Sequence, residues 1–209
     1  MRVDAGRPAL EAILLAAGAG RRLGVPKALL CLRGVWMLPR LAESLHAAGA
    51  ARVHVVARAE ERAELAARGL PACATLHVNP APESGRTGSV LVGLRAVSGA
   101  SAVLVHPCDV PLLSAAAAAT LVEAWRRAPD RDRLAARLVT PSGRGGHPLL
   151  LGNVRAAAAR RLAPTASLRE ILHADPARRL DVVLRGDPGP FLDVDTPEQL
   201  ALVESLLPT

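Results

Sequence analysis

Short apolar runs alternate with amphipathic segments along most of the chain. Runs with the length of buried strands occur at residues 11–17, 52–58, 74–79 and 101–109. Segments with apolar residues at helical spacing follow them, at residues 36–48, 60–68, 87–97 and 114–127. Strands that alternate with helices are typical of an open sheet with helices packed against it. The pattern therefore predicts an α/β fold with a mostly parallel sheet and helices on both faces.

The last third of the chain is less regular and contains the glycine-rich turn SGRGG. Strands are predicted on both sides of this turn, followed by two helices, a strand and a final helix that begins just after Pro197. The first five of these elements are expected at residues 134–141, 147–152, 153–162, 167–173 and 179–185. We see no repeat at solenoid spacing and no low-complexity linker.

Length and composition fit one ordinary domain. The chain has 209 residues, of which 50% are apolar, enough for one substantial core. We expect residues 1–209 to form a single domain, with residues 1–9 as a flexible tail.

No apolar run reaches the roughly 18 residues of a membrane helix, and the N-terminus lacks a secretory signal. The three cysteines have no CxxC spacing, which argues against a disulfide framework or a zinc site. A cytoplasmic protein without a membrane partner is expected.

The formal net charge of +7 raises the question of nucleic-acid binding. The arginines are scattered among acids, and there are only three aromatic residues to stack on bases: Trp36, Trp125 and Phe191. An arginine-rich nucleic-acid binder, which would be retained on duplex DNA in a salt-sensitive way, is therefore disfavoured. A basic surface suits an anionic small molecule instead.

The stretch ILLAAGAGRRLGVPK follows the first predicted strand and contains the only lysine of the chain, Lys27. Ligands bind beyond the carboxyl ends of strands in open parallel sheets. Gly18 and Gly20 let the backbone approach a ligand and expose N–H groups to phosphate oxygens, while Arg22 and Lys27 supply positive charge. The loop lacks both the GxGxxG spacing of dinucleotide sites and the GK[ST] ending of a P-loop.

A plain strand-to-helix turn would explain the glycines but not the lysine. All other cationic side chains of the chain are arginines. A compact ammonium at Lys27 therefore indicates a site where a planar guanidinium does not fit. We interpret the loop as a polyphosphate site.

Two acids are placed to hold a metal ion beside this loop. Asp109 ends the strand AVLVHPCD at the same edge of the sheet, and Asp195 directly precedes the last helix. Mg²⁺ prefers hard carboxylate oxygens, and both residues are candidate ligands. An ordinary helix cap explains Asp195 equally well. Asp193 should point to the opposite side because side chains alternate along a strand.

These motifs resemble those of the MobA-like NTP transferases, nucleotidyltransferases with a three-layer, Rossmann-like (GT-A-like) fold. LAAGAGRRLGVPK matches the family's opening motif, while HPCDVPLL and DVDTPEQL resemble its two acidic segments. Within the family the likeness is greatest to molybdenum cofactor cytidylyltransferases. The chain departs from the pattern at His106-Pro107-Cys108, where small residues usually precede the acid.

The resemblance implies roles for particular residues. Mg²⁺ would bind Asp109 and Asp195, and Arg22, Lys27 and Asp109 would be catalytic. NPAPESGRTGSVLVGL resembles a segment that lines the nucleotide, with Asn79 as a lesser match, and SGRGGHPLLL one near the acceptor, where His147 would contact an anion or have a structural role. The implied nucleotide-binding residues are Leu15, Ala16, Ala17, Gly18, Gly20, Arg22, Lys27, Gly88 and Ser89.

The implied reaction is nucleotidyl transfer, in which an acceptor phosphate attacks the α-phosphate of an NTP. The sequence LAAG, rather than the LAGG of guanylyl-transferring relatives, favours CTP as the donor. The whole pattern favours a molybdopterin acceptor, with a molybdoenzyme of the xanthine dehydrogenase type as a partner. A sugar phosphate, methylerythritol phosphate or phospholactate acceptor stays open, as does a non-catalytic nucleotide-binding module of molybdoenzyme maturation.

Overall fold

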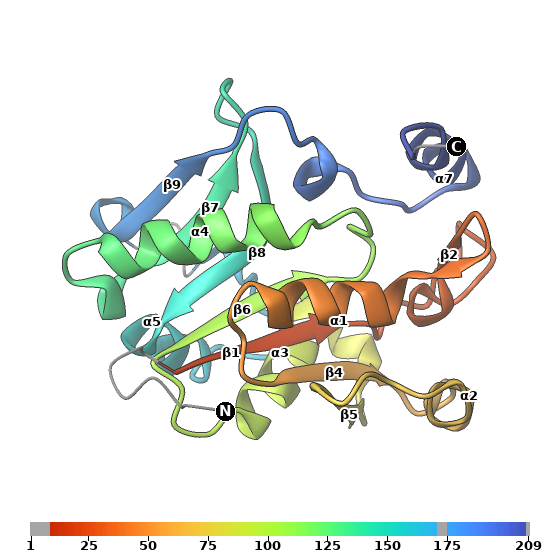
Figure 1. The fold of residues 1–209 in the computed structure, drawn as a ribbon. Coiled ribbons are helices and arrows are strands. Elements are labelled where there is room, and N and C mark those ends of the chain that lie inside the picture. Colours follow the sequence, from red (N-terminus) through yellow and green to blue (C-terminus); the bar gives the residue numbers. More distant parts are fainter. Residues whose placement is uncertain (1–8, 171–174, 208–209) are drawn as a thin grey trace.

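The structure is a computed structural model and describes residues 9–170 and 175–207. Within these residues, a seven-stranded sheet with the order β5-β4-β1-β6-β8-β7-β9 forms the centre of the molecule (Figure 1). Only β8 runs antiparallel to its neighbours there. The strands are β1 (Leu10–Leu15), β4 (Val53–Arg58), β5 (Ala74–Asn79), β6 (Ala102–Pro107), β7 (Ala135–Val139), β8 (Gly145–Gly152) and β9 (Arg179–Val183).

Helices cover both faces of this sheet (Figure 1). The helices are α1 (Met37–Ala47), α2 (Arg62–Arg68), α3 (Gly85–Ala96), α4 (Ala115–Arg127), α5 (Asn153–Ala159) and α7 (Pro197–Ser205). Shorter 3-10 helices lie at Lys27–Leu29, Pro82–Ser84, Arg131–Arg133, Pro176–Arg178 and Gly189–Phe191. The expected α/β, three-layer Rossmann-like architecture with a mostly parallel sheet is confirmed.

Alternation along β1 divides the core into two layers. Ala12 and Leu14 pack with the apolar faces of α1 and α4, whereas Ile13 and Leu15 pack with α3 and α5. Helix α3 approaches the sheet closely, because a Cβ added at Gly93 would lie 2.5 Å from Ile13 Cγ2. Burial on both faces explains why β1 is apolar at nearly every position.

The register of two neighbouring strands creates the edge where the predicted motifs meet. β1 and β6 are parallel, with Leu15 opposite Pro107. The chain therefore leaves both strands at one edge of the sheet. The glycine loop follows Leu15 there, and Asp109 follows Pro107 by two residues.

Several features lie outside what the apolar pattern predicted. The short hairpin β2 (Cys31–Leu32) and β3 (Val35–Trp36) forms a separate sheet that periodicity did not reveal. Residues 171–174 of the helix expected at 167–173, and residues 1–8 of the expected tail, lie outside the described residues. Ala9 is anchored, since its carbonyl accepts a hydrogen bond from the Ser101 amide. Over residues 9–170 and 175–207, none of the helices is long and apolar enough to cross a membrane.

Candidate functional site

The solitary lysine lies between the two predicted metal ligands. Lys27 Nζ donates hydrogen bonds to Asp109 Oδ2, at 2.5 Å, and to Asp195 Oδ1. Arg22 Nη2 lies 3.0 Å from the other oxygen of Asp195. Four side chains from three distant parts of the chain thus form one ion-pair network at the carboxyl edge of the sheet. Their roles toward a nucleotide and a metal stay predictions.

The glycine loop folds back on the end of β1, and this return positions Lys27. The Lys27 amide donates to the Gly18 carbonyl at 3.1 Å. A Cβ on Gly18 would lie 2.8 Å from Lys27 Cδ, so the lysine stem packs directly against the glycine. Gly20 has φ +61°, and a Cβ there would lie 1.7 Å from the Val25 carbonyl oxygen. Neither position has room for a side chain.

Backbone hydrogen bonds bring the two acids to the loop. The Cys108 amide donates to the Leu15 carbonyl at 2.9 Å, which fixes the segment after β6 against the end of β1. The Val194 amide donates to the Asp109 carbonyl at 2.7 Å and so ties the C-terminal segment to the same point. Asp195 is therefore held next to Asp109 although the two are far apart in sequence.

The helix-cap explanation for Asp195 does not match the structure. Thr196 is the N-cap of α7, and its side chain accepts a hydrogen bond from the Gln199 amide. The Gln199 side chain in turn accepts from the amides of Asp195 and Thr196, which completes a capping box. The Asp195 carboxylate takes no part in the cap and is directed to Lys27 and Arg22.

The network is charged at neutral pH. Burial lowers the pKa of Lys27, but the charges and hydrogen bonds of Asp109 and Asp195 outweigh burial and hold it above its ordinary value. The hydrogen bond from Lys27 is the main reason that the pKa of Asp195 is lowered. A protonated ammonium and an ionised carboxylate therefore face each other here.

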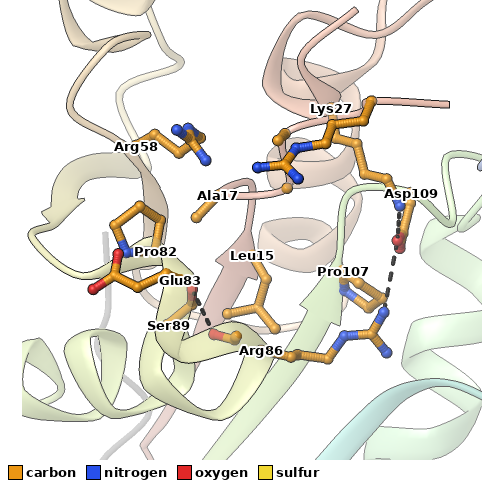
Figure 2. A pocket seen from close by; sticks show the side chains of 14 residues that line it. Leu15, Ala17, Lys27, Arg58, Pro82, Glu83, Arg86, Ser89, Pro107 and Asp109 are labelled. Carbon is orange, nitrogen blue, oxygen red and sulfur yellow. Dashed lines mark hydrogen bonds and ion pairs between the residues drawn. The ribbon is translucent and has the colours of Figure 1, made fainter. Parts of the chain in front are cut away.

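A cavity of about 480 Å³, called here the first cavity, opens beside this network. Figure 2 shows Lys27 and Asp109 on one side of it, with Pro82, Glu83 and Ser89 opposite. Six of the predicted site residues line it: Leu15, Ala17, Gly18, Lys27, Ser89 and Asp109. Ala16, Gly20 and Gly88 are buried and do not belong to its lining.

Asn79 supports the wall of the first cavity from behind. Its side chain is buried, donates to Ser89 Oγ at 3.0 Å, and accepts a hydrogen bond from the Ala81 amide. These bonds fix the end of β5 to the start of α3. Asn79 therefore contacts Ser89 and the loop backbone rather than the cavity itself.

A second cavity of about 370 Å³ adjoins the first. Arg86 and Asp109 line both cavities. The other residues of the second cavity are Val110, Arg144, Gly145, Gly146, His147, Arg169, Pro190, Phe191, Asp193 and Asp195. The sequence analysis did not identify Arg86, Arg144 and Arg169 as site residues. It also predicted that Asp193 points away from the site, whereas Asp193 lines this cavity. The only available signal was that Arg86 and Arg144 lie in two glycine-containing segments, NPAPESGRTGSVLVGL and SGRGGHPLLL.

His147 is a half-buried, neutral part of the wall of the second cavity. Burial, followed by the charge of Arg86, lowers its pKa to about 4, and its buried Nδ1 has no hydrogen-bond partner among the described residues. His106 packs edge-on against it with ring centroids 6.1 Å apart. His106 Nε2 lies 2.9 Å from the Val110 carbonyl oxygen, so the unusual residue before Asp109 fixes the following turn.

The family assignment follows from the sequence match. Residues 12–181 match the model of the MobA-like NTP transferase domain. The chain belongs to this family. It is therefore a nucleotidyltransferase by family.

Two curated relatives are similar in sequence to this chain, and their names describe different activities. Nicotine blue oxidoreductase of Paenarthrobacter nicotinovorans is 34% identical over 202 residues, 94% of this chain and 97% of that protein. The 2-C-methyl-D-erythritol 4-phosphate cytidylyltransferase of Rhodococcus opacus (strain B4) is 42% identical over 103 residues, 48% of this chain and 44% of that protein.

A solved structure shows the same fold. The crystal structure of Rv0371c from Mycobacterium tuberculosis H37Rv superimposes with a TM-score of 0.78, at 20% identity, over 95% of this chain and 98% of that one. A further crystal structure of Rv0371c is a complex with manganese, with a TM-score of 0.74 at 18% identity over 95% of this chain and 100% of that one.

The carboxylates of this MobA-like domain fit a divalent cation completed by substrate oxygens. Among the described residues, no cluster of three or more His, Cys, Asp or Glu side chains is arranged to hold a metal alone. Asp109 Oδ1 is buried and has no hydrogen-bond partner among them, and Asp195 lies across Lys27 from it. Mg²⁺ is commonly held by one or two carboxylates together with substrate phosphates. Two acids beside the glycine loop match that donor set.

Proposed function

We propose that this protein is a magnesium-dependent cytidylyltransferase that transfers CMP from CTP to the phosphate of a molybdopterin-type cofactor and releases pyrophosphate. The observation that carries the proposal is the junction of two cavities at Asp109, beside the ammonium of Lys27. Group transfer requires two substrate sites that share one reacting point. The two cavities have this relationship.

CTP is assigned to the first cavity. Lys27 and the free amides of the glycine loop favour the triphosphate at one end. The base is assigned to the opposite end, near Ala17, Pro82 and Ser89, which offers small side chains and one hydroxyl. The LAAG sequence of the loop supports cytosine over guanine. A cytidylyltransferase among the relatives supports the same choice.

The phosphorylated acceptor is assigned to the second cavity. Arg86, Arg144 and Arg169 give it three cationic side chains, and neutral His147 adds an imidazole whose Nδ1 has no hydrogen-bond partner among the described residues. Arginine forks suit phosphate oxygens because two N–H groups bind at once. The choice of molybdopterin among phosphorylated acceptors is supported by the likeness of the motifs to molybdenum cofactor cytidylyltransferases.

The chemistry assigned to the chain is positioning and charge neutralisation. An acceptor phosphate oxygen forms a bond to the α-phosphorus, the bond to the bridging oxygen breaks, and its electron pair leaves with pyrophosphate. Lys27 and Arg22 would neutralise the phosphate oxygens of the donor. The attacking phosphate is already ionised, so no general base is needed and the neutral state of His147 is compatible with the reaction.

In this scheme Asp109 and Asp195 would hold Mg²⁺ together with substrate oxygens. When bound, it would act as a Lewis acid on phosphate oxygens. Lys27 now lies between the same two carboxylates, so loading with metal and nucleotide requires its ammonium to turn toward the phosphates. The lysine thus keeps the carboxylates compensated before substrate binds.

Pyrophosphate release tests this proposal. Purified protein is supplied with Mg²⁺, each of the four NTPs and one acceptor at a time: molybdopterin, methylerythritol phosphate, a sugar 1-phosphate or phospholactate. We expect turnover with CTP and molybdopterin, and loss of it in the Lys27→Ala and Asp109→Ala variants. Turnover with another pair would reassign the substrates. Binding of NTP without turnover on any acceptor would favour a non-catalytic nucleotide-binding module.

A redox activity is the second candidate because a relative that matches nearly the whole chain is named nicotine blue oxidoreductase. The glycine spacing of the loop differs from the dinucleotide fingerprint and gives this candidate less support. The same preparations are therefore assayed for decolorisation of nicotine blue by a reduced nicotinamide dinucleotide. Decolorisation that survives Lys27→Ala would place such an activity outside the phosphate loop.

Delivery of the nucleotidyl-transfer product to a molybdoenzyme of the xanthine dehydrogenase type stays a prediction.

A further inference from the structure

Arg86 occupies the boundary between the two cavities. It is the second residue of α3, its side chain is 58% exposed, and it belongs to both linings. Figure 2 shows the guanidinium extended from α3 toward Asp109, the other residue that the linings share. A long cationic side chain at this boundary can reach ligands in either cavity.

Each of the other described cations that line the two cavities belongs to only one of them. Arg58 lines only the first cavity and pairs with Glu60 at 3.0 Å. Arg144 lines only the second cavity and donates to the Phe191 carbonyl at 2.8 Å. The contact of Arg86 with Asp109, by contrast, is 3.7 Å long, beyond hydrogen-bond distance. Among the described residues, Arg86 is thus the one cation that lines both cavities, and its long contact with Asp109 leaves it able to turn toward a ligand.

The charge of Arg86 affects the pKa of a residue in the second cavity. Burial is the main cause that lowers the pKa of His147, and Arg86 is the next. His147 lines the second cavity, although Arg86 is carried by a helix that forms the wall of the first.

We propose that Arg86 binds both substrates at once and stabilises the charge on the α-phosphate as it passes between them. The inference rests on the proposed nucleotidyl transfer. In that reaction the α-phosphate oxygens carry charge while the bond to the acceptor oxygen forms and the bond to the pyrophosphate breaks. A guanidinium between the two substrates can donate to an α-phosphate oxygen and to the acceptor phosphate in parallel.

Binding measurements test the inference without any need for turnover. CTP with Mg²⁺ is titrated by calorimetry onto wild type and single variants, and inorganic phosphate is then titrated onto protein saturated with a non-hydrolysable CTP analogue. Arg86→Ala should weaken both ligands by about tenfold. Arg58→Ala should weaken only CTP, and Arg144→Ala only phosphate.

Arg95→Ala is the matched control for loss of one positive charge, because Arg95 is an exposed residue at the other end of α3. It should leave both dissociation constants unchanged. An Arg86→Ala variant that binds phosphate as tightly as Arg95→Ala does would overturn the inference. Melting curves of all variants confirm that each remains folded.

Kinetics then separate contact with substrate from support of Asp109. Arg86→Ala should lower kcat on the order of 10²-fold, with partial rescue by added guanidinium ion and none by raised Mg²⁺. Full rescue by Mg²⁺ would show that Arg86 only positions Asp109 and would overturn the inference. Failure of wild type to use any NTP would instead contradict the proposed function, and the binding series would still decide whether Arg86 serves both cavities.

Discussion

Lys27 Nζ lies 2.5 Å from Asp109 Oδ2, although 82 residues separate the two in sequence. The contact joins the loop after β1 to the turn after β6, and the lysine side chain that makes it is only 14% exposed. The stem is confined by Gly18, and the ammonium is confined by two carboxylates. This confinement gives a physical reason for a lysine in a chain whose other long cations are arginines.

Lys27→Arg should therefore fail to replace the lysine. The planar guanidinium is wider than the ammonium and cannot sit between Asp109 and Asp195 without displacing the stem from Gly18. We expect kcat/KM for CTP to fall on the order of 10²-fold, measured by pyrophosphate release. Arg22→Lys provides the reciprocal control at an exposed position, and a loss of less than about tenfold is expected there. A Lys27→Arg enzyme with near-normal kinetics would contradict the confinement argument.

Gly18→Ala tests the packing of the Lys27 stem against Gly18. The added methyl would lie 2.8 Å from Lys27 Cδ and would push the stem away from Asp109. We expect weaker CTP binding, by about tenfold, because the ammonium no longer reaches the phosphates. Ala19→Gly serves as the control in the same loop, where the change removes a side chain and creates no contact. Equal CTP affinities in Gly18→Ala and wild type would show that the stem can shift freely.

Much of the fold could be predicted from the sequence because a doubly covered sheet leaves a strong apolar signal. The seven runs that form the sheet were visible as strands, with ends that differ from the observed ones by a few residues. The hairpin β2–β3 was missed because two-residue strands are too short to show alternation.

Only part of the candidate site could be predicted from the sequence. Lys27, Asp109 and Asp195 stood out because each lies in a motif at the end of a recognisable element. Arg86 also lies in a quoted motif segment but was not singled out, since one arginine among many is distinguished only by the cavities that meet around it. The orientation of Asp193 was misjudged because it follows a 3-10 helix, Gly189–Phe191, where strand alternation does not apply.

Asp109→Asn should weaken the binding of a divalent cation and leave the fold intact. The amide keeps the shape of the carboxylate but loses the charge that a divalent cation and Lys27 both need. We expect the Mn²⁺ dissociation constant in the presence of CTP to rise at least about tenfold, measured by electron paramagnetic resonance. Asp193→Asn, on an exposed side chain that lies 3.9 Å from Arg144, should leave Mn²⁺ affinity unchanged. Equal Mn²⁺ affinities in both variants would exclude Asp109 as a ligand.

Gly93→Ala tests the close packing of α3 on β1. The new Cβ would lie 2.5 Å from Ile13 Cγ2, and Ile13 is fully buried. Overpacking of this kind lowers the free energy of unfolding by about 1–3 kcal/mol, more than the helical propensity of alanine returns. Urea denaturation measures the change. The double variant with Ile13→Ala should be more stable than the sum of the single changes predicts, since Ile13→Ala removes the overlap.

Two histidines with lowered pKa values, His106 and His147, should make the protein sensitive to mild acid. Burial lowers the pKa of His106 to about 3 and is the main cause that lowers the pKa of His147 to about 4. The unfolded chain takes up protons at these residues below pH about 6.5, whereas the folded chain does not. Their contribution to stability is therefore complete above that pH and is lost as the pH falls toward 4. The pKa of Asp195 is lowered from 3.8, so its contribution is lost only at still lower pH.

The expected slope is about 1.4 kcal/mol per pH unit for each histidine between pH about 6.5 and about 4. Urea denaturation at a series of pH values measures the free energy of unfolding over this range. His106→Gln should remove roughly half of the slope from these two groups, because a glutamine amide can still donate to the Val110 carbonyl but does not titrate. An unaltered slope in this variant would mean that His106 is protonated in the folded protein, in conflict with its complete burial.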